Sequence, residues 1–343
     1  MRVLVTGATG FVGSHTARAL VEAGHRVRVL VRNPDRLAAL GGLAARVEVA
    51  AGDMTDAAAV GRALDDQDAV VHAAALVRLE RKHAARVLAA NRAGVEQVIG
   101  AAAARGVPRI LYVSSAVALF HPDGDSPYTR SKTEAEQQVR VLQAQGAPIR
   151  TTYPAGVLGP DDPGLSASNR GLVALCRVPV VTRGGLQLVD VRDVAAAHVR
   201  LLELPPGPGG HLLCGHFLRW SEVIDRLEAI TGHRFRRLPV PGPLLRAAGA
   251  VCDAIQRVHD LELPLTLEAA RIMTQWTPIA PDPRDGGLGI AFRDPAETIR
   301  DTLRWLHATT GVDGCASITD SRFPRRRRSP PPAPGAPGRA PPA

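Results

Sequence analysis

The sequence predicts an α/β fold, in which a doubly wound parallel sheet is followed by a smaller C-terminal α+β cap. Three observations support this. The chain opens with the apolar run Val3-Leu4-Val5, as expected of a central parallel strand buried on both faces. This run leads directly into a group of glycines and an amphipathic helix that ends at Gly24. Further short apolar runs then alternate with helical patterns up to about residue 160.

The glycines between the first strand and the first helix have a characteristic spacing. Gly7, Gly10 and Gly13 follow the pattern G-x-x-G-x-x-G. They allow a tight turn, a close approach of bare backbone to a pyrophosphate, and tight packing of the helix on the sheet. The free N–H groups at the start of that helix attract an anion. We therefore expect a Rossmann-type dinucleotide site here; a glycine-rich turn that binds nothing is the alternative.

The rest of the chain divides into a nucleotide part, a cap and a tail. After the first helix, predicted strands cover 26–32, 46–53, 68–76, 109–116 and 149–156, and predicted helices cover 56–66, 80–105 and 128–145. We expect 161–185 to be irregular, 186–203 to be a strand and helix that return to the main sheet, and helices at 221–231, 243–259 and 295–309. The predicted domains are 1–160 with 186–204 for NAD(P), 161–185 with 205–312 for substrate, and a disordered Arg/Pro-rich tail, 313–343.

Composition excludes several classes of protein. The net charge of +9 is uneven, because residues 317–343 hold six arginines and one aspartate, which leaves the body only mildly basic. We therefore expect no specific nucleic-acid partner. No apolar run approaches the ~20 residues of a membrane span. Four scattered cysteines predict no metal site and no disulfide framework, which favours the cytoplasm.

A tyrosine and a lysine one helical turn apart form the candidate catalytic pair. Tyr128 and Lys132 have the spacing Y-x-x-x-K, which places both side chains on the same helix face. A nearby ammonium favours the phenolate and so lowers the pKa of a tyrosine. The chain has three tyrosines and two lysines, so a chance pair at this spacing is rare. Ser114 and Ser115, at the end of the preceding strand, both qualify by position to bind a substrate oxygen.

Together, TGATGFVG, the strand-end serines and Tyr128-Lys132 resemble the extended branch of the short-chain dehydrogenases/reductases, over about residues 1–312. The likeness is to NAD(P)-dependent epimerases/dehydratases and dihydroflavonol-reductase-like proteins. In such proteins the serine before the alanine acts, which selects Ser115. The resemblance also implies that Asn91 holds an active-site water and the nearby backbone. Without the resemblance, Asn91 would be interpreted as an ordinary amide on a helix surface.

The same resemblance implies which residues contact the cofactor. These are Thr6, Gly7, Gly10, Phe11, Val12 and Gly13 in the first turn, Arg32, the pair Asp53 and Met54 at the adenine edge, Ala73, Ala74 and Ala75 after the fourth strand, Tyr128 and Lys132, and Tyr153, Pro154 and Val157. For the three alanines, tight packing alone is an equally good explanation. Many sugar-nucleotide enzymes have an arginine before this proline, where this sequence has Tyr153. The loop between Ser115 and Tyr128 is also shorter than in many relatives.

The end of the second strand bears on the choice of cofactor. In this fold an acid at that position selects NAD, whereas an arginine accommodates the 2′-phosphate of NADP. Arg32 occupies the position, with Arg36 close behind. The sequence thus favours NADP, with NAD possible; a solvated arginine at a strand end is the alternative.

The residues after Ser115 bear on the reaction. A dehydratase needs an acidic pair beside the serine, but Ala116, Val117 and Ala118 follow it. We therefore expect hydride transfer to or from an apolar ketone or alcohol, with Leu119, Phe120 and the helix at 244–255 as candidate walls. A nucleotide-sugar epimerase or dehydratase is the first alternative, and a non-catalytic NAD(P)-binding regulator, which typically lacks the tyrosine–lysine pair, is the second. A homodimer is possible.

Overall fold

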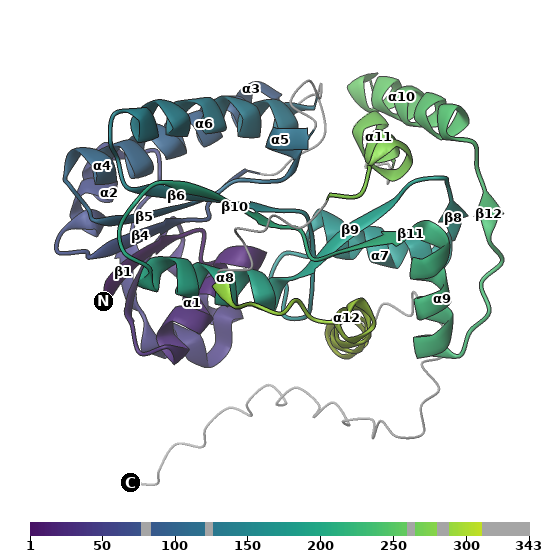
Figure 1. Cartoon of the computed structure of the whole chain (residues 1–343), viewed down its shortest axis with the longest axis horizontal. Coiled ribbons are helices and arrows are strands. Elements are labelled where there is room, and N and C mark those ends of the chain that lie inside the picture. Colours follow the sequence, from purple (N-terminus) through teal and green to yellow (C-terminus); the bar gives the residue numbers. More distant parts are fainter. Residues whose placement is uncertain (77–83, 121–125, 259–264, 280–287, 311–343) are drawn as a thin grey trace, which may run out of the picture.

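The centre of the molecule is a parallel sheet. The computed structural model describes residues 1–76, 84–120, 126–258, 265–279 and 288–310, and in them seven parallel strands lie in the order β10-β6-β5-β4-β1-β2-β3 (Figure 1). The strands are β1 (Arg2–Thr6), β2 (Arg26–Val31), β3 (Glu48–Ala51), β4 (Ala69–His72), β5 (Arg109–Val113), β6 (Ile149–Pro154) and β10 (Gly209–Leu213). Strand order reverses between β1 and β4, which confirms the doubly wound α/β fold and places the switch point beside the glycine turn.

Helices cover both faces of this sheet. Successive residues of β1 point to opposite faces, so the strand contributes to two different cores. Val3 and Val5 join one core, with α1 (Phe11–Glu22) and α8 (Val191–Glu203), whereas Leu4 joins the other. The helices on the second face are α2 (Ala57–Leu64), α3 (Ala84–Gly94), α4 (Ala101–Ala104), α5 (Val117–Phe120) and α6 (Pro127–Ala144). Figure 1 shows α6 above the sheet and α1 with α8 below it.

Two segments of this part have unusual helical geometry. A π-helical segment, Val95–Gly100, joins α3 to α4, and 3₁₀ turns interrupted at Gly41 run through Pro34–Arg46. The helix predicted over 80–105 therefore includes a π segment, and its first residues, 80–83, lie outside the described residues.

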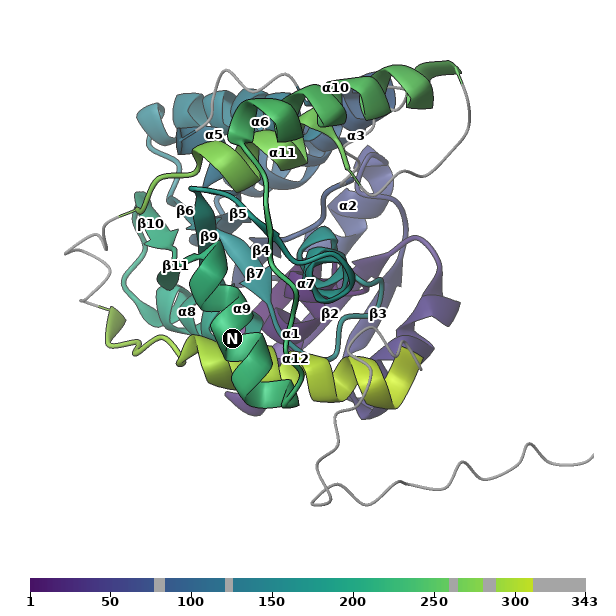
Figure 2. The ribbon, with the colours of Figure 1, turned by 90° about the vertical axis from the view of Figure 1, so that its right-hand side faces the viewer.

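The C-terminal part builds a smaller α+β unit. Its strands are β7 (Gly156–Leu158), β9 (Gly185–Asp190) and β11 (His216–Arg219) in one sheet, with β8 (Val180–Val181) paired to β12 (Leu238–Pro239). Its helices are α7 (Ala167–Arg177), α9 (Trp220–Thr231), α10 (Gly242–Val258), α11 (Leu267–Gln275) and α12 (Pro295–Thr310). Leu188, Ile224 and Ile299 meet in its core. Figure 2 views the molecule from this side, with α9 lying against α12.

The prediction for residues 186–204 is right for the helix and wrong for the strand. Helix α8 packs against α1, but β9 pairs with β7 and β11 in the small sheet. Strand β10, which was expected in the cap, is instead the edge of the main sheet beside β6. The difference lies in packing: Leu188 of β9 joins the cap core, and Leu213 of β10 joins the core under the main sheet. Where the two domains divide stays a prediction.

Among the described residues, three α-helices were not predicted: the four-residue α5, α7 and α11. Residues 161–185, expected to be irregular, contain α7, whose N-terminus is capped by Ser166 and whose Leu172 and Leu175 are buried. Helix α11 is capped by Thr266, which accepts from the Ala269 N–H over 3.1 Å. The predicted tail, 313–343, lies outside the described residues. Among the helices that are described, none has the length and hydropathy to cross a bilayer.

A buried carboxylate fastens α12 to the start of α8. Asp190 accepts the Arg192 N–H over 2.8 Å and the Thr298 hydroxyl over 2.8 Å, and its side chain is 0% exposed. The Arg192 guanidinium bridges Asp190 and Asp301, at 2.7 and 2.8 Å. Because α12 packs in the core of the smaller unit and α8 packs against α1, this network joins the smaller unit to the main sheet.

Candidate active site

The turn between β1 and α1 leaves no room for a side chain at Gly7 or Gly13. Gly7 has a φ of 80°, and a Cβ added to it would lie 2.6 Å from the Ala74 nitrogen and 2.7 Å from the Ala73 carbonyl carbon. A Cβ on Gly13 would lie 2.1 Å from the Gly7 oxygen, and the Gly10 N–H donates to that oxygen over 2.9 Å. Helix α1 begins without a side-chain cap, so its first N–H groups stay available to an anion.

The other residues of this turn direct their side chains into the protein. Thr6 Oγ1 lies 2.7 Å from His72 Nδ1. Phe11 is 9% exposed and meets His15 edge-on, and Val12 packs against the core beneath the sheet. Cofactor contacts at Thr6, Phe11 and Val12 stay predictions, and they would be made through the backbone.

Arg32 follows β2 at the edge of the site and pairs with a carboxylate. Its Nε lies 3.6 Å from Asp53 Oδ2, with side-chain exposures of 66% and 37%. Asp53 Oδ1 also accepts the N–H and the hydroxyl of Thr55, each over 2.9 Å. The next residue, Met54, is turned inward against Gly94. Arg32 is thus open to a ligand, although Asp53 neutralises part of its charge.

Helix α6 carries the candidate catalytic pair and is called the catalytic helix for that reason; it starts immediately before Tyr128. Ser126 caps it by accepting the Thr129 N–H over 3.0 Å, and Pro127 occupies the first helical position. Tyr128 follows in the first turn, where the Ser115 hydroxyl interacts with its own. Burial raises the pKa of Tyr128 above its ordinary value, Ser115 lowers it in part, and Glu268 raises it further.

Lys132 lies one turn after Tyr128 and is only 5% exposed. Its ammonium donates to the Val113 carbonyl over 3.0 Å and lies 5.4 Å from the centre of the Tyr112 ring. Burial lowers its pKa to about 8, and Glu136 opposes that shift. At Tyr128 burial dominates and the pKa is shifted upward, so the lowering of this pKa by Lys132 stays a prediction.

Asn91 joins α3 to the catalytic helix. Its amide nitrogen donates to Ser131 Oγ over 3.0 Å and to the Leu76 carbonyl over 3.1 Å, and its oxygen accepts the Leu76 N–H over 2.7 Å. Ser131 in turn donates to the Tyr128 carbonyl over 2.8 Å. The buried amide therefore holds the segment that follows β4 and the turn of α6 that carries Tyr128. Its role in holding an active-site water stays a prediction.

Tyr153 makes a contact that the sequence did not predict. Its hydroxyl donates to Glu136 Oε1 over 2.5 Å, and Arg140 Nε donates to the same oxygen over 3.1 Å. Glu136 is 4% exposed and lies one turn beyond Lys132 on α6. Tyr153 therefore braces the catalytic helix from β6, and any cofactor contact at Tyr153 stays a prediction.

The two other predicted contacts that follow β6 lie close to the site. The Pro154 carbonyl accepts the Ala116 N–H over 2.9 Å, which fixes the residue after Ser115. Val157 packs against the core beneath the main sheet. Ala75 is partly buried in the segment leading from β4 to Leu76. Cofactor contacts at these positions stay predictions as well.

Apolar side chains close the site on the cap side. Trp276, Ala116 and Val117 form a buried cluster against which Tyr128 and Phe217 pack. Of the walls expected from the sequence, Phe120 is 44% exposed. Helix α10 does not present its large residues to this cluster: Leu244 and Val251 are 62% and 58% exposed.

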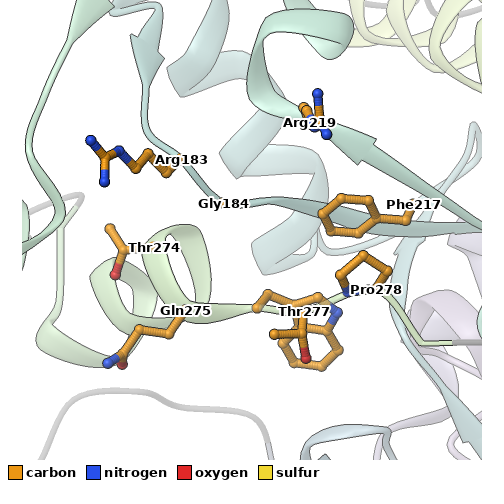
Figure 3. Close-up of a pocket in the computed structure, with 9 residues that line it drawn as sticks. Arg183, Gly184, Phe217, Arg219, Thr274, Gln275, Thr277 and Pro278 are labelled. Carbon is orange, nitrogen blue, oxygen red and sulfur yellow. The ribbon is translucent and has the colours of Figure 1, made fainter.

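A pocket of about 340 Å³ lies in the cap and shares Phe217 and Trp276 with this apolar cluster. Figure 3 shows residues that line it, which come from the start of β9, from β11 and from the end of α11: Arg183, Gly184, Phe217, Arg219, Thr274, Gln275, Trp276, Thr277 and Pro278. Arg183 and Arg219 are exposed, and among the described residues neither guanidinium has an acidic partner. This pocket suits a ligand with both a flat or apolar part and an anionic group.

The structure thus brings together Ser115, Tyr128, Lys132 and Asn91. Sequence reasoning missed Glu136 and Ser131, which surround them. For Glu136 a signal was present: it lies on the helix face of Lys132 and Val139, where a carboxylate is unexpected without a partner.

Comparison with known proteins agrees with this arrangement. Residues 3–215 match the model of the NAD dependent epimerase/dehydratase family. The chain is 30% identical to sterol demethylase protein B of Methylococcus capsulatus over 275 residues, 75% of this chain and 83% of that protein. It is 29% identical to 2-alkyl-3-oxoalkanoate reductase of Stenotrophomonas maltophilia, with 91% and 100% covered.

Among solved structures, a UDP-glucose-4-epimerase from Stenotrophomonas maltophila with bound NAD and formylated UDP-arabinopyranose superposes with a TM-score of 0.67. Its identity is 22%, and the match covers 91% of this chain and 99% of that one. The fold is therefore shared. With the family model covering more than half of its length, the chain belongs to the NAD dependent epimerase/dehydratase family.

Proposed function

We propose that this member of an NAD(P)-dependent enzyme family is an oxidoreductase that uses NADP(H) to interconvert a carbonyl group and a secondary alcohol. The observation that carries the proposal is the meeting of the Ser115 and Tyr128 hydroxyls beside buried Lys132. Two hydroxyl groups at one point can both hydrogen-bond a substrate oxygen.

Each residue then has a distinct task. NADPH, when bound, supplies the hydride. Ser115 donates to the substrate oxygen and orients the carbonyl, and Tyr128 gives that oxygen a proton as negative charge develops on it. The raised pKa of Tyr128 keeps it protonated at neutral pH, which suits the reductive direction. Lys132, whose ammonium donates to the Val113 carbonyl, would bind the ribose hydroxyls of the cofactor.

The choice of NADP(H) rests on Arg32. Its side chain is 66% exposed at the end of β2, where the adenosine ribose is expected in this fold. A 2′-phosphate there would replace Asp53 as the partner of the guanidinium. Asp53 would still accept the N–H and the hydroxyl of Thr55 when its pairing with Arg32 is lost.

An apolar substrate is supported by the surroundings of the two hydroxyls. Ala116, Val117 and Trp276 are buried next to Tyr128, and the three residues after Ser115 carry no carboxylate for a dehydration. The names of two relatives refer to a sterol and to a 2-alkyl-3-oxoalkanoate, both rich in hydrocarbon. We propose a small apolar ketone or alcohol as substrate and the cytoplasm as the compartment.

A nucleotide-sugar epimerase is the second candidate, because one observation favours it. The pocket lined by Phe217 also has Arg183 and Arg219 at its edge, and two guanidinium groups with no acidic partner among the described residues can bind a diphosphate. The absence of an arginine at position 153 and the apolar cluster at Tyr128 favour the reductase.

Neighbouring serines provide the test. Ser115→Ala and Tyr128→Phe should each lower turnover of an apolar ketone by about 100-fold or more, since each removes a group that contacts the reacting oxygen. Calorimetry should show NADPH binding kept in both. Ser114→Ala is the matched control, and its turnover should stay close to that of the unmodified protein. Loss of turnover in Ser114→Ala with full activity in Ser115→Ala would overturn the assignment.

A further inference from the structure

A carboxylate of the cap reaches the start of the catalytic helix. Glu268 lies in the first turn of α11, and its Oε1 accepts the hydroxyl hydrogen of Thr129. Thr129 is the residue after Tyr128 and is only 1% exposed, whereas Glu268 is half-buried. A hydrogen bond from a hydroxyl to a carboxylate is stronger than one between two neutral groups. The contact therefore joins α11 to the turn of α6 that carries the candidate proton donor.

This contact also sets the direction of a short chain of hydroxyl groups. Because the Thr129 hydroxyl donates to Glu268, its oxygen can still accept, and it accepts the Ser126 hydroxyl over 3.2 Å. The Ser126 oxygen in turn accepts the Thr129 N–H over 3.0 Å and so caps α6. The carboxylate of Glu268 thus orders the polar groups on both sides of Tyr128.

Helix α11 is held at both ends, so Glu268 has a defined position. At its start Thr266 caps the helix, and a place in the first turn favours the ionised form of Glu268. Toward its end, the Met273 carbonyl accepts the Trp220 indole N–H over 2.8 Å and the Thr182 hydroxyl over 2.6 Å. Figure 1 shows α11 facing α5 and α6 from the cap. The helix therefore connects the cap to the start of α6.

We propose that Glu268 is a positioning residue of the cap, which acts through Thr129 to keep the Tyr128 hydroxyl at the reacting carbonyl. Its use in catalysis rests on the proposed function, whereas its hold on the start of α6 does not. Burial raises the pKa of Tyr128, the Ser115 hydroxyl lowers it in part, and the Glu268 charge raises it further, which keeps the tyrosine protonated for donation. Ile272, one turn further along α11, packs against the same apolar cluster as Tyr128.

Kinetics of three substitutions test the proposal. Glu268→Ala should lower kcat for an apolar ketone by about tenfold and leave the KM for NADPH unchanged, since a small misplacement of a reacting group is costly. Glu268→Gln should recover most of that loss, because its amide oxygen can still accept the Thr129 hydroxyl. Thr129→Val removes the same hydrogen bond from the other side, so the double variant Glu268→Ala with Thr129→Val should be no slower than either single variant.

Glu222→Ala is the matched control for loss of a carboxylate from a cap helix. Glu222 lies in the first turn of α9 and accepts the Arg219 N–H over 2.7 Å. This substitution should lower the melting temperature, as Glu268→Ala does, but leave kcat unchanged. Four results would overturn the proposal: an unchanged kcat in Glu268→Ala, an equal loss in Glu222→Ala, no recovery in Glu268→Gln, or additive effects in the double variant.

Hydrogen–deuterium exchange measures the positioning without turnover. Amide exchange in residues 126–132 should be faster in Glu268→Ala than in the unmodified protein or in Glu222→Ala, because the start of α6 loses its contact with the cap. Unchanged exchange in this segment would also overturn the proposal. If the unmodified protein reduces no ketone while this exchange still responds to Glu268→Ala, the proposed function fails and the hold of Glu268 on the start of α6 stands.

Discussion

Tyr153 donates its hydroxyl hydrogen to the buried carboxylate of Glu136 over 2.5 Å, and this joins β6 to the catalytic helix α6. Glu136 shares its helix face with Lys132, one turn away, and Arg140 donates to the same carboxylate oxygen from the following turn. The contact fixes the rotation of α6 about its axis. The positions of Tyr128 and Lys132 therefore depend on a residue that lies outside the reacting groups.

Removing the Tyr153 hydroxyl should destabilise the protein. Tyr153→Phe leaves a buried carboxylate with one fewer donor, which costs about 1–3 kcal/mol of unfolding free energy, measured by urea denaturation. Arg140→Ala removes the other donor, but the Arg140 side chain is 60% exposed and should contribute less than about 1 kcal/mol. Equal losses of unfolding free energy in the two variants would show that the buried hydrogen bond from Tyr153 contributes no more than the exposed one from Arg140.

The burial of Lys132 should make stability depend on pH. Its pKa falls from 10.5 in the unfolded chain to about 8 in the folded protein. Between these two values the unfolded chain holds a proton that the folded protein has released, so rising pH favours folding there. Relative to Lys132→Met, the unmodified protein should gain stability from pH 8 to 10.5, by about 3 kcal/mol at most. A constant difference across that window would contradict the buried, partly deprotonated lysine.

Cofactor preference should follow Arg32. Arg32→Asp should weaken NADPH binding by about tenfold or more and affect NADH less, since the 2′-phosphate would meet two carboxylates, the new one and Asp53. Arg36→Asp introduces the same charge change four residues away and serves as the control. Calorimetric titration with both cofactors measures the effect. An unchanged cofactor preference in Arg32→Asp, or an equal change in both variants, would contradict the proposal that Arg32 selects NADP(H).

The glycine turn and the shared helix face of Tyr128 and Lys132 could be predicted because each depends on local chain geometry. Gly7 needs its positive φ and its contact with Ala74, and Tyr128 and Lys132 need only one helical turn between them. The placement of β9 and β10 could not be predicted, because both are short apolar runs and only packing with distant residues separates Leu188 from Leu213. The role of Tyr153 was hidden for the same reason, since its partner Glu136 lies on another element.

The most direct test of the central claim is a substrate panel read by NADPH absorbance and by NMR of the products. Apolar ketones and alcohols are run beside UDP- and dTDP-sugars, with Tyr128→Phe in parallel. We expect net oxidation of NADPH with an apolar ketone, and loss of that oxidation in Tyr128→Phe. Turnover confined to the sugars, without net change in the cofactor, would contradict it and identify an epimerase.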